Sequence, residues 1–242
     1  MKTKITFLKA SLVALFLFVS STAWSATYYT CSGATLSLTT PVVTGITYTW
    51  DVKPAAGGAS ITGFPSATAP TTLPASGSYT VYLSSAQTVP GSGICPADVV
   101  ENTFIVLPSL SIALVDPTHP SYCAANTTVV SSDITVTGPV LPSTSGSDLV
   151  LDYTYSVSAV TSSGTNVVDG TTVGTIDQAT GKFTLTTLIP GVYTVTGKVK
   201  YKAAASPTNT LLGTGCEATS AVTKVITVIE KPTAPIITIS AS

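Results

Sequence analysis

The residues that could do acid–base chemistry in this chain are few. His119 is the single histidine, and it stands between Pro117 and Pro120 in the stretch DPTHPSYC. A general base needs a partner within hydrogen-bond reach, and Asp116 or Ser121 could be that partner. The first half of the chain has no counterpart of this stretch, so we interpret it as a loop between two domains.

One pair of carboxylates has the spacing of a metal site. Asp148 and Asp152 lie four residues apart and would share one face of a strand. They could hold a calcium ion there if a loop added carbonyl oxygens, but we expect a solvated strand edge. No glycine-rich phosphate loop, Gly-x-Ser-x-Gly elbow or metalloprotease helix occurs in the sequence. The chain is therefore predicted to be no enzyme, with no cofactor and no metal.

Four cysteines could bind zinc or form disulfides. Zinc sites use closely spaced ligands such as Cys-x-x-Cys, which this sequence lacks, and His119 alone is a poor fourth ligand. We therefore expect two disulfides, for which three pairings exist. The cysteines concerned are Cys31, Cys95, Cys123 and Cys216.

The start of the chain has the pattern of an export signal. Lys2 and Lys4 precede the apolar run ASLVALFLFV (10–19), and the stretch AWS places small residues at a cleavage site. The apolar run is shorter than the roughly 20 residues that cross a bilayer. We expect residues 1–25 to be a cleaved signal peptide, with no membrane span in the mature chain. A secreted or cell-surface location would preserve disulfides.

The charge of the chain does not favour binding of a polyanion such as nucleic acid. It has 10 Lys, no Arg and 11 acidic residues. Removal of residues 1–25 takes away three of the Lys and leaves 7 against 11, a formal charge of −4. Because Arg is the side chain best suited to gripping phosphate, its absence argues against nucleic acid as a partner. The abundance of Thr, Ser and Val favours strands.

Two pairs of similar stretches indicate an internal repeat. TYTWDV (47–52) corresponds to DYTYSV (152–157), and SGSYTVYL (76–83) corresponds to PGVYTVTG (190–197). In each copy a cysteine precedes these stretches, a second cysteine follows them, and an apolar strand closed by proline comes last. The recurrence of this order indicates a duplication.

The repeat predicts two domains, residues 26–108 and residues 109–230, the second with longer loops. It also selects one pairing of the cysteines, with one disulfide in each domain: Cys31 with Cys95, and Cys123 with Cys216. The aromatic residues at the repeated positions are expected in the two cores: Trp50, Tyr79, Tyr155 and Tyr193.

Alternation of apolar and polar residues over short stretches predicts antiparallel strands with one buried face. Residues 34–39 are predicted as a strand, and residues 176–183 as a hairpin in which Gly181 has a positive φ. No helical stripe longer than ten residues follows the signal. The predicted fold class is all-β, with two tandem antiparallel β-sandwiches.

A Gly-x-Tyr sequence opens one strand in each copy. It resembles the tyrosine corner of immunoglobulin-like (Ig-like) sandwiches, in which the tyrosine hydroxyl bonds to nearby backbone. Antibody domains carry a cysteine two residues after that tyrosine, but Val81 and Val195 stand there. Tyr82 is expected on the opposite face from Tyr79, as ordinary surface.

Several stretches together resemble the Ig-like and PKD-like repeats of Bacteroidota surface proteins: YTCSGATLSLT, YTWDV, ASGSYTVYL and TFIVLP. Such proteins include gliding-motility adhesins, very long chains that leave the cell by type IX secretion. The likeness covers most of residues 27–230. The tail EKPTAPIITISAS (230–242) resembles a linker and the first strand of a further repeat, which we assign to residues 231–242.

The resemblance implies a secreted or surface-displayed protein without enzymatic activity. It would act as an adhesin or structural stalk and form the N-terminal part of a longer chain. Its partners would be surface glycans or proteins, and further Ig-like domains of the same chain. Two alternatives stay open: an accessory, carbohydrate-binding module of an extracellular enzyme, or a subunit of a surface filament assembled by strand exchange.

Overall fold

The computed structural model describes residues 25–91, 93–125 and 128–233. The predicted signal peptide, apart from Ser25, lies outside these described residues. The same holds for residues 234–242 of the predicted further repeat.

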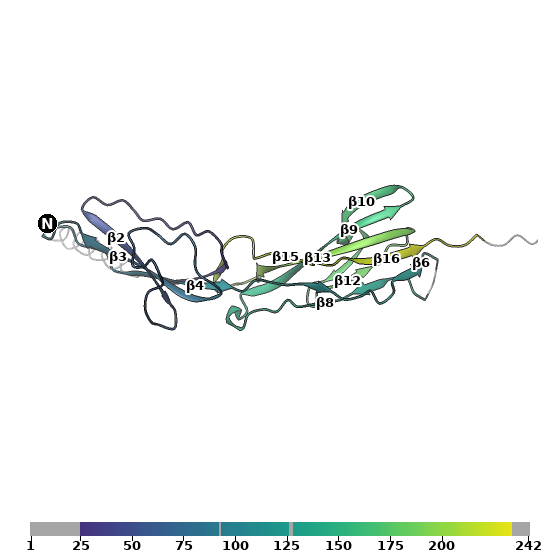
Figure 1. Cartoon of the computed structure of the whole chain (residues 1–242), viewed down its shortest axis with the longest axis horizontal. Helices are drawn as coiled ribbons and strands as arrows, with labels where there is room; N and C mark the ends of the chain where they lie inside the picture. Colours follow the sequence, from purple (N-terminus) through teal and green to yellow (C-terminus); the bar gives the residue numbers. More distant parts are fainter. Residues whose placement is uncertain (1–24, 92, 126–127, 234–242) are drawn as a thin grey trace, which may run out of the picture. The chain divides into compact units, whose positions relative to one another are not determined.

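Two compact units make up the chain (Figure 1). Unit 1 contains the described residues up to Pro108 together with Thr208–Gly213. Unit 2 contains Ser109–Pro207 and the described residues from Thr214 onward. The segment Thr208–Gly213 therefore departs from the division predicted from the repeat, which placed it in the second domain. It does so because its strand, Thr210–Leu211, joins the sheet of unit 1.

Unit 1 is built on one five-stranded sheet with the order β14-β1-β4-β3-β2. The first strand pairs in parallel with both β4 and β14, and the other pairs are antiparallel. The strands are β1 (Ala26–Cys31), β2 (Ile46–Pro54), β3 (Gly77–Gln87), β4 (Val100–Leu107) and β14 (Thr210–Leu211).

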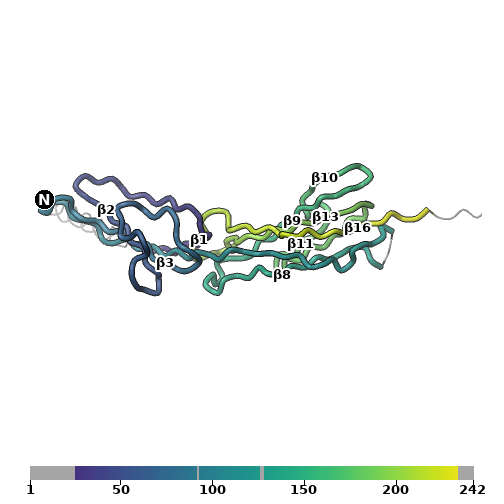
Figure 2. The backbone as a smooth tube through the Cα atoms, viewed as in Figure 1, coloured from purple at the N-terminus to yellow at the C-terminus, as the bar shows by residue number. Residues whose placement is uncertain are grey.

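Irregular segments cover the inner face of this sheet. Residues 32–45 and 55–76 contain no strand, and a single bridge joins Trp50 to Ser66 (Figure 2). The predicted strand at residues 34–39 is therefore wrong, although its alternation is real, since it lacks a partner strand. These segments still contribute Leu36 and Leu73 to the core. The buried core of unit 1 consists of Leu36, Trp50, Val52, Leu73, Val81, Phe104 and Val106.

Unit 2 is a complete two-layer sandwich. Its larger sheet has the order β10-β9-β13-β16-β6, and β15 also pairs with β13. A three-stranded sheet β11-β12-β7 and a two-stranded sheet β5-β8 complete the unit. The larger sheet contains β6 (Ser121–Cys123), β9 (Leu149–Thr161), β10 (Gly164–Asp169), β13 (Gly191–Ala203), β15 (Ala218–Thr219) and β16 (Lys224–Ile229). The smaller sheets contain β5 (Ala113–Leu114), β7 (Ser132–Ile134), β8 (Val136–Thr137), β11 (Gly174–Asp177) and β12 (Lys182–Leu185).

Helix is confined to two short turns among the described residues, η1 (Ser143–Ser145) and α2 (Gly170–Val173). The predicted hairpin is confirmed, because β11 and β12 pair in antiparallel fashion and Gly181 has a φ of 71°. The core of unit 2 follows the predicted alternation in β13, where every second residue from Tyr193 to Tyr201 is buried. Burial of this β-branched and aromatic face is the main driving force for the fold.

Four strands follow the same order in the two main sheets, β2-β3-β4-β1 in unit 1 and β9-β13-β16-β6 in unit 2, and their central strands also share a register. Trp50 lies opposite Leu83 in unit 1, and Val52 lies opposite Val81. In unit 2 the corresponding pairs are Tyr155 with Gly197 and Val157 with Val195. The similar stretches in the sequence thus occupy the same places in the two sheets.

The edge strands correspond as well. Cys31 in β1 lies opposite Leu107, and Cys123 in β6 lies opposite Ile229, in each case across a parallel pair. The structure therefore consists of two tandem Ig-like β-sandwich units whose main sheets share four equivalent strands. They differ in the second layer and in the fifth strand, which is β14 beside β1 in unit 1 and β10 beside β9 in unit 2.

Candidate functional site

The cysteines do not pair as predicted. Cys31 is bonded to Cys216, whereas Cys95 and Cys123 are free thiols. The expected bonds Cys31–Cys95 and Cys123–Cys216 are therefore wrong. The parallel pairing of β1 with β14 explains the observed bond. Tyr29 lies opposite Leu211, and from there both segments run in the same direction toward Cys31 and Cys216.

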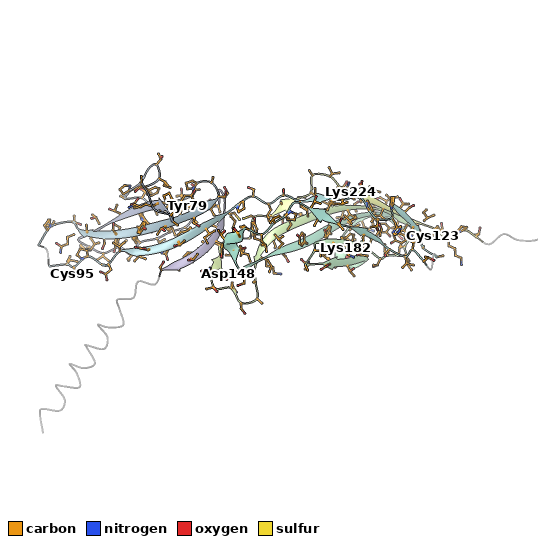
Figure 3. All side chains as sticks on the ribbon, turned by 90° about the horizontal axis from the view of Figure 1, so that it is seen from below. Tyr79, Cys95, Cys123, Asp148, Lys182 and Lys224 are labelled. Carbon is orange, nitrogen blue, oxygen red and sulfur yellow. The ribbon has the colours of Figure 1, made fainter. Side chains whose placement is uncertain are left out.

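The repeated tyrosines both form the tie of a tyrosine corner. The Tyr79 hydroxyl donates to the Ala75 carbonyl at 3.0 Å, and the Tyr193 hydroxyl donates to the Ile189 carbonyl at 2.8 Å. Tyr193 is buried, while Tyr79 is half-buried at the edge of its core (Figure 3). Each tie fixes the loop that leads into the central strand.

The other two aromatic residues of the repeat are buried in the cores. Trp50 packs among the apolar residues of unit 1, and Tyr155 stacks on Phe183 with ring centroids 4.9 Å apart. The Tyr155 hydroxyl donates to the Gly181 carbonyl. Burial raises the pKa of this hydroxyl, which also lies near Tyr153. These side chains therefore stabilise the fold and are not exposed to a ligand.

Among the described residues, His119 is not hydrogen-bonded to either predicted partner, Asp116 or Ser121, and its interaction with a carboxylate is electrostatic, with Asp133. Its ring is exposed and lies 3.4 Å from the Thr118 hydroxyl, and its backbone N–H donates to the Ser132 hydroxyl. Asp116, the candidate partner, instead makes an ion pair with Lys224 at 2.6 Å. The contacts of His119 are those of a loop residue at the start of unit 2.

The pair Asp148 and Asp152 does not have the predicted environment. Asp148 is only 5% exposed and lies just before β9, so a solvated strand edge is the wrong description for it. Asp152 makes ion pairs with Lys200 at 3.7 Å and Lys202 at 3.3 Å. Within residues 25–91, 93–125 and 128–233, no three His, Cys, Asp or Glu side chains gather as metal ligands would.

Asp133 makes polar contacts that were not predicted from the sequence. Its carboxylate accepts hydrogen bonds from the Thr184 hydroxyl at 2.7 Å and from the Lys182 ammonium at 3.2 Å. Partial burial opposes ionisation, but these two bonds outweigh it and hold the pKa of Asp133 below its ordinary value. The cluster joins β7 to β12 and is structural.

Tyr82 lies on the outer face of unit 1 and is partly covered. The Lys53 ammonium lies 5.6 Å from the centroid of its ring, and Lys53 also pairs with Asp51 at 3.3 Å. The ring is therefore engaged by a neighbouring cation.

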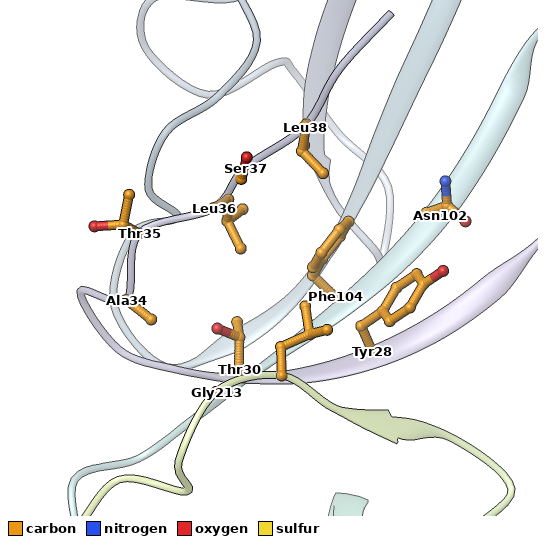
Figure 4. Close-up of a pocket in the computed structure, with 11 residues that line it drawn as sticks. Tyr28, Thr30, Ala34, Thr35, Leu36, Ser37, Leu38, Asn102, Phe104 and Gly213 are labelled. Atoms are coloured by element: carbon orange, nitrogen blue, oxygen red, sulfur yellow. The ribbon is translucent and has the colours of Figure 1, made fainter.

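An apolar groove lies beside the sheet of unit 1. It has a volume of about 440 Å³, within the roughly 300–1,000 Å³ of ligand pockets. Figure 4 shows Leu36 and Leu38 on one side of it and Tyr28 and Phe104, from the sheet, on the other. Its lining comprises Tyr28, Thr30, Ala34, Thr35, Leu36, Ser37, Leu38, Asn102, Phe104, Leu212 and Gly213.

The lining of the groove contains no charged side chain. Tyr28 and Phe104 stack with centroids 5.3 Å apart and form the floor. Asn102 is already engaged, since its side-chain oxygen accepts from the Ala26 N–H at 3.3 Å. The groove therefore suits an apolar, uncharged occupant. The alternation of apolar and polar residues at 34–39 is the sequence feature that could have indicated the groove. That pattern alone does not identify what binds there.

No helix in the described part of the chain is long and apolar enough to span a membrane.

No protein-family model matches the chain, and no curated protein sequence does. Among solved structures, the FN1–FN3 domains of chicken CNTN1 match with a TM-score of 0.36 and 11% identity, over 84% of this chain and 62% of that chain. Fibronectin(III)-like modules of Clostridium thermocellum CbhA match with a TM-score of 0.34 and 12% identity, over 87% and 93%. The N-terminal four Ig domains of Dscam1 isoform 8.4 match with a TM-score of 0.28 and 9% identity, over 88% and 45%. The chain thus spans less than two thirds of the CNTN1 and Dscam1 chains. Likeness at this level supports no functional argument.

Proposed function

We propose that this protein is a non-enzymatic Ig-like repeat protein that is exported and acts at the cell surface as an adhesin or structural stalk. It would form the N-terminal part of a longer chain, with partners among surface glycans, proteins and further Ig-like domains. The alternative of an accessory module of an extracellular enzyme stays a prediction.

The observation that carries the proposal is the equivalence of the two units. The shared order of four strands, the shared register and a tyrosine corner in each unit support a repeated module. Repeated modules extend a chain and present loops at a distance from an anchor. The disulfide between Cys31 and Cys216 fits an oxidising compartment outside the cytosol.

Surface labelling of the source cells tests the proposal. An antibody against unit 2 should label intact cells, and the N-terminal sequence of the extracted chain should begin at Ala26. A strain that lacks the gene should attach to its natural substratum more weakly, and the intact gene should restore attachment. A matched control gene without codons 2–25 should leave the protein inside the cell. Retention of Met1 in a cytosolic protein, or unchanged attachment, would count against the proposal.

A further inference from the structure

Unit 2 has a strand that unit 1 lacks among the described residues. Leu114 in β5 and Ile112 just before it are each 6% exposed and belong to the core. The backbone of this strand bonds to the neighbouring edge, where Leu114 lies opposite Val136 and the Val115 N–H donates to the Thr135 carbonyl at 2.9 Å. This short strand closes the second layer of unit 2.

Unit 1 has the edge that such a strand would join. Residues 34–39 correspond to residues 132–137, since Leu36 and Ile134 are both buried in their cores. Each also contacts the segment that leads into the tyrosine strand: the Leu36 N–H donates to the Thr71 carbonyl, and Ile134 lies opposite Phe183.

The edge of unit 1 is unpaired. Residues 37–39 make no backbone hydrogen bond within the described chain. In unit 2 the corresponding residues Thr135, Val136 and Thr137 are the ones that pair with β5. The described part of unit 1 offers no substitute for β5, since β1 begins at Ala26.

The apolar groove lies at this same edge. Leu36 and Leu38 form its wall, and Tyr28 and Phe104 form its floor (Figure 4). An extended segment with alternating apolar residues would satisfy both the groove and the unpaired backbone.

One segment of this chain has the required sequence. PIITISA (235–241) matches PSLSIAL (108–114), the stretch that ends in β5. Ile237 and Ile239 take the places of Leu110 and Ile112, and Thr238 that of Ser111. Both stretches follow the last strand of a unit, and neither contains a charged residue, which suits the uncharged lining of the groove.

We propose that the groove of unit 1 binds residues 235–241 of a second copy of this chain as an added strand. Each copy would supply its tail to the next, so that copies join head to tail. The inference rests on the proposed export, since cleavage after Ser25 would remove the residues that precede β1. It assigns residues 235–241 to a second copy in place of their proposed role as the first strand of a further repeat in the same chain.

A peptide of residues 232–242, titrated into the chain that ends at Thr233, tests the groove directly. We expect saturable binding and slower amide exchange at residues 37–39. Leu38→Glu in the chain, or Ile239→Asp in the peptide, should weaken binding at least about tenfold, because each places a charge in an apolar groove. Val42→Glu is the matched control, since Val42 is 99% exposed on the same segment and its variant should bind normally. Amide exchange does not depend on a variant and keeps the test valid if Leu38→Glu fails to fold.

Sedimentation of the chain 26–242 tests assembly. We expect concentration-dependent oligomers that the chain ending at Thr233 does not form. Absence of peptide binding, binding without protection at residues 37–39, or a monomer at every concentration overturns the proposal. None of these results would alter surface labelling of cells, so the proposed function is tested separately.

Discussion

Loss of the Cys31–Cys216 bond should be the most destabilising single change at a cysteine. The bond closes a loop of about 185 residues, from position 31 to position 216. On the chain-entropy description of cross-links, a loop of this length stabilises the folded state by about 5 kcal/mol, since it restricts the unfolded chain. Cys216→Ser should therefore lower the total free energy of unfolding by about that amount.

Chemical denaturation of the chain 26–242 measures this loss. Trp50 is the single tryptophan after residue 25, so its emission reports unit 1, while circular dichroism reports both units. Cys95→Ser is the matched control, because Cys95 is an exposed free thiol, and it should leave the midpoint unchanged. Peptide mapping without reduction should recover one linked peptide, containing positions 31 and 216.

Two results would refute this reasoning. The first is a linked peptide that joins Cys31 to Cys95, which would restore the pairing expected from the repeat. The second is equal destabilisation by Cys95→Ser and Cys216→Ser, because a free thiol closes no loop. Alkylation of the unfolded, unreduced chain gives an independent count, and two reactive thiols are expected.

Three further predictions concern unit 2. Tyr193→Phe removes the hydroxyl of a tyrosine corner and should cost about 1 kcal/mol, a fall of about 4 °C in the unfolding temperature of that unit by calorimetry. Asp133→Asn should make the free energy of unfolding fall less steeply as the pH is lowered. Folding lowers the pKa of Asp133, so this carboxylate stabilises the protein fully above pH 3.8, the ordinary pKa. That stabilisation is lost as the pH falls through the lowered pKa of the folded state. Denaturation at a series of pH values measures this, and an unchanged slope would contradict it. Gly197→Leu should destabilise unit 2 by about 1–3 kcal/mol in chemical denaturation, because its side chain would meet Leu114, whereas Leu already stands at the equivalent place in unit 1.

The class of fold could be predicted from the sequence because the alternation of core residues is local. Tyr193, Val195 and Val199 each indicate a buried face within a few residues of their neighbours, and the structure buries all three. The hairpin around Gly181 depends on one short turn and is predictable for the same reason. Features of this kind can be predicted without knowing which strand lies opposite in the sheet.

The disulfide and the groove could not be predicted in this way. The bond at Cys31 depends on β14, a two-residue strand that pairs with β1 across about 180 residues of chain, and nothing in its sequence indicates that pairing. The repeat suggested the wrong partner because the equivalence of Cys31 and Cys123 in their sheets does not extend to the second cysteines. The groove depends on a strand that one unit has and the other lacks among the described residues.

The position of the Cys31–Cys216 cross-link sets how the molecule would respond to tension. A pull on the two ends would pass from Cys31 straight to Cys216 through the sulfur atoms, and the residues between them would feel no stretching. Only the strands outside the loop could be pulled from their sheets: β1 on one side, and β15 and β16 on the other. A protein cross-linked in this way would lengthen little under tension and would return to its original length when the tension is released.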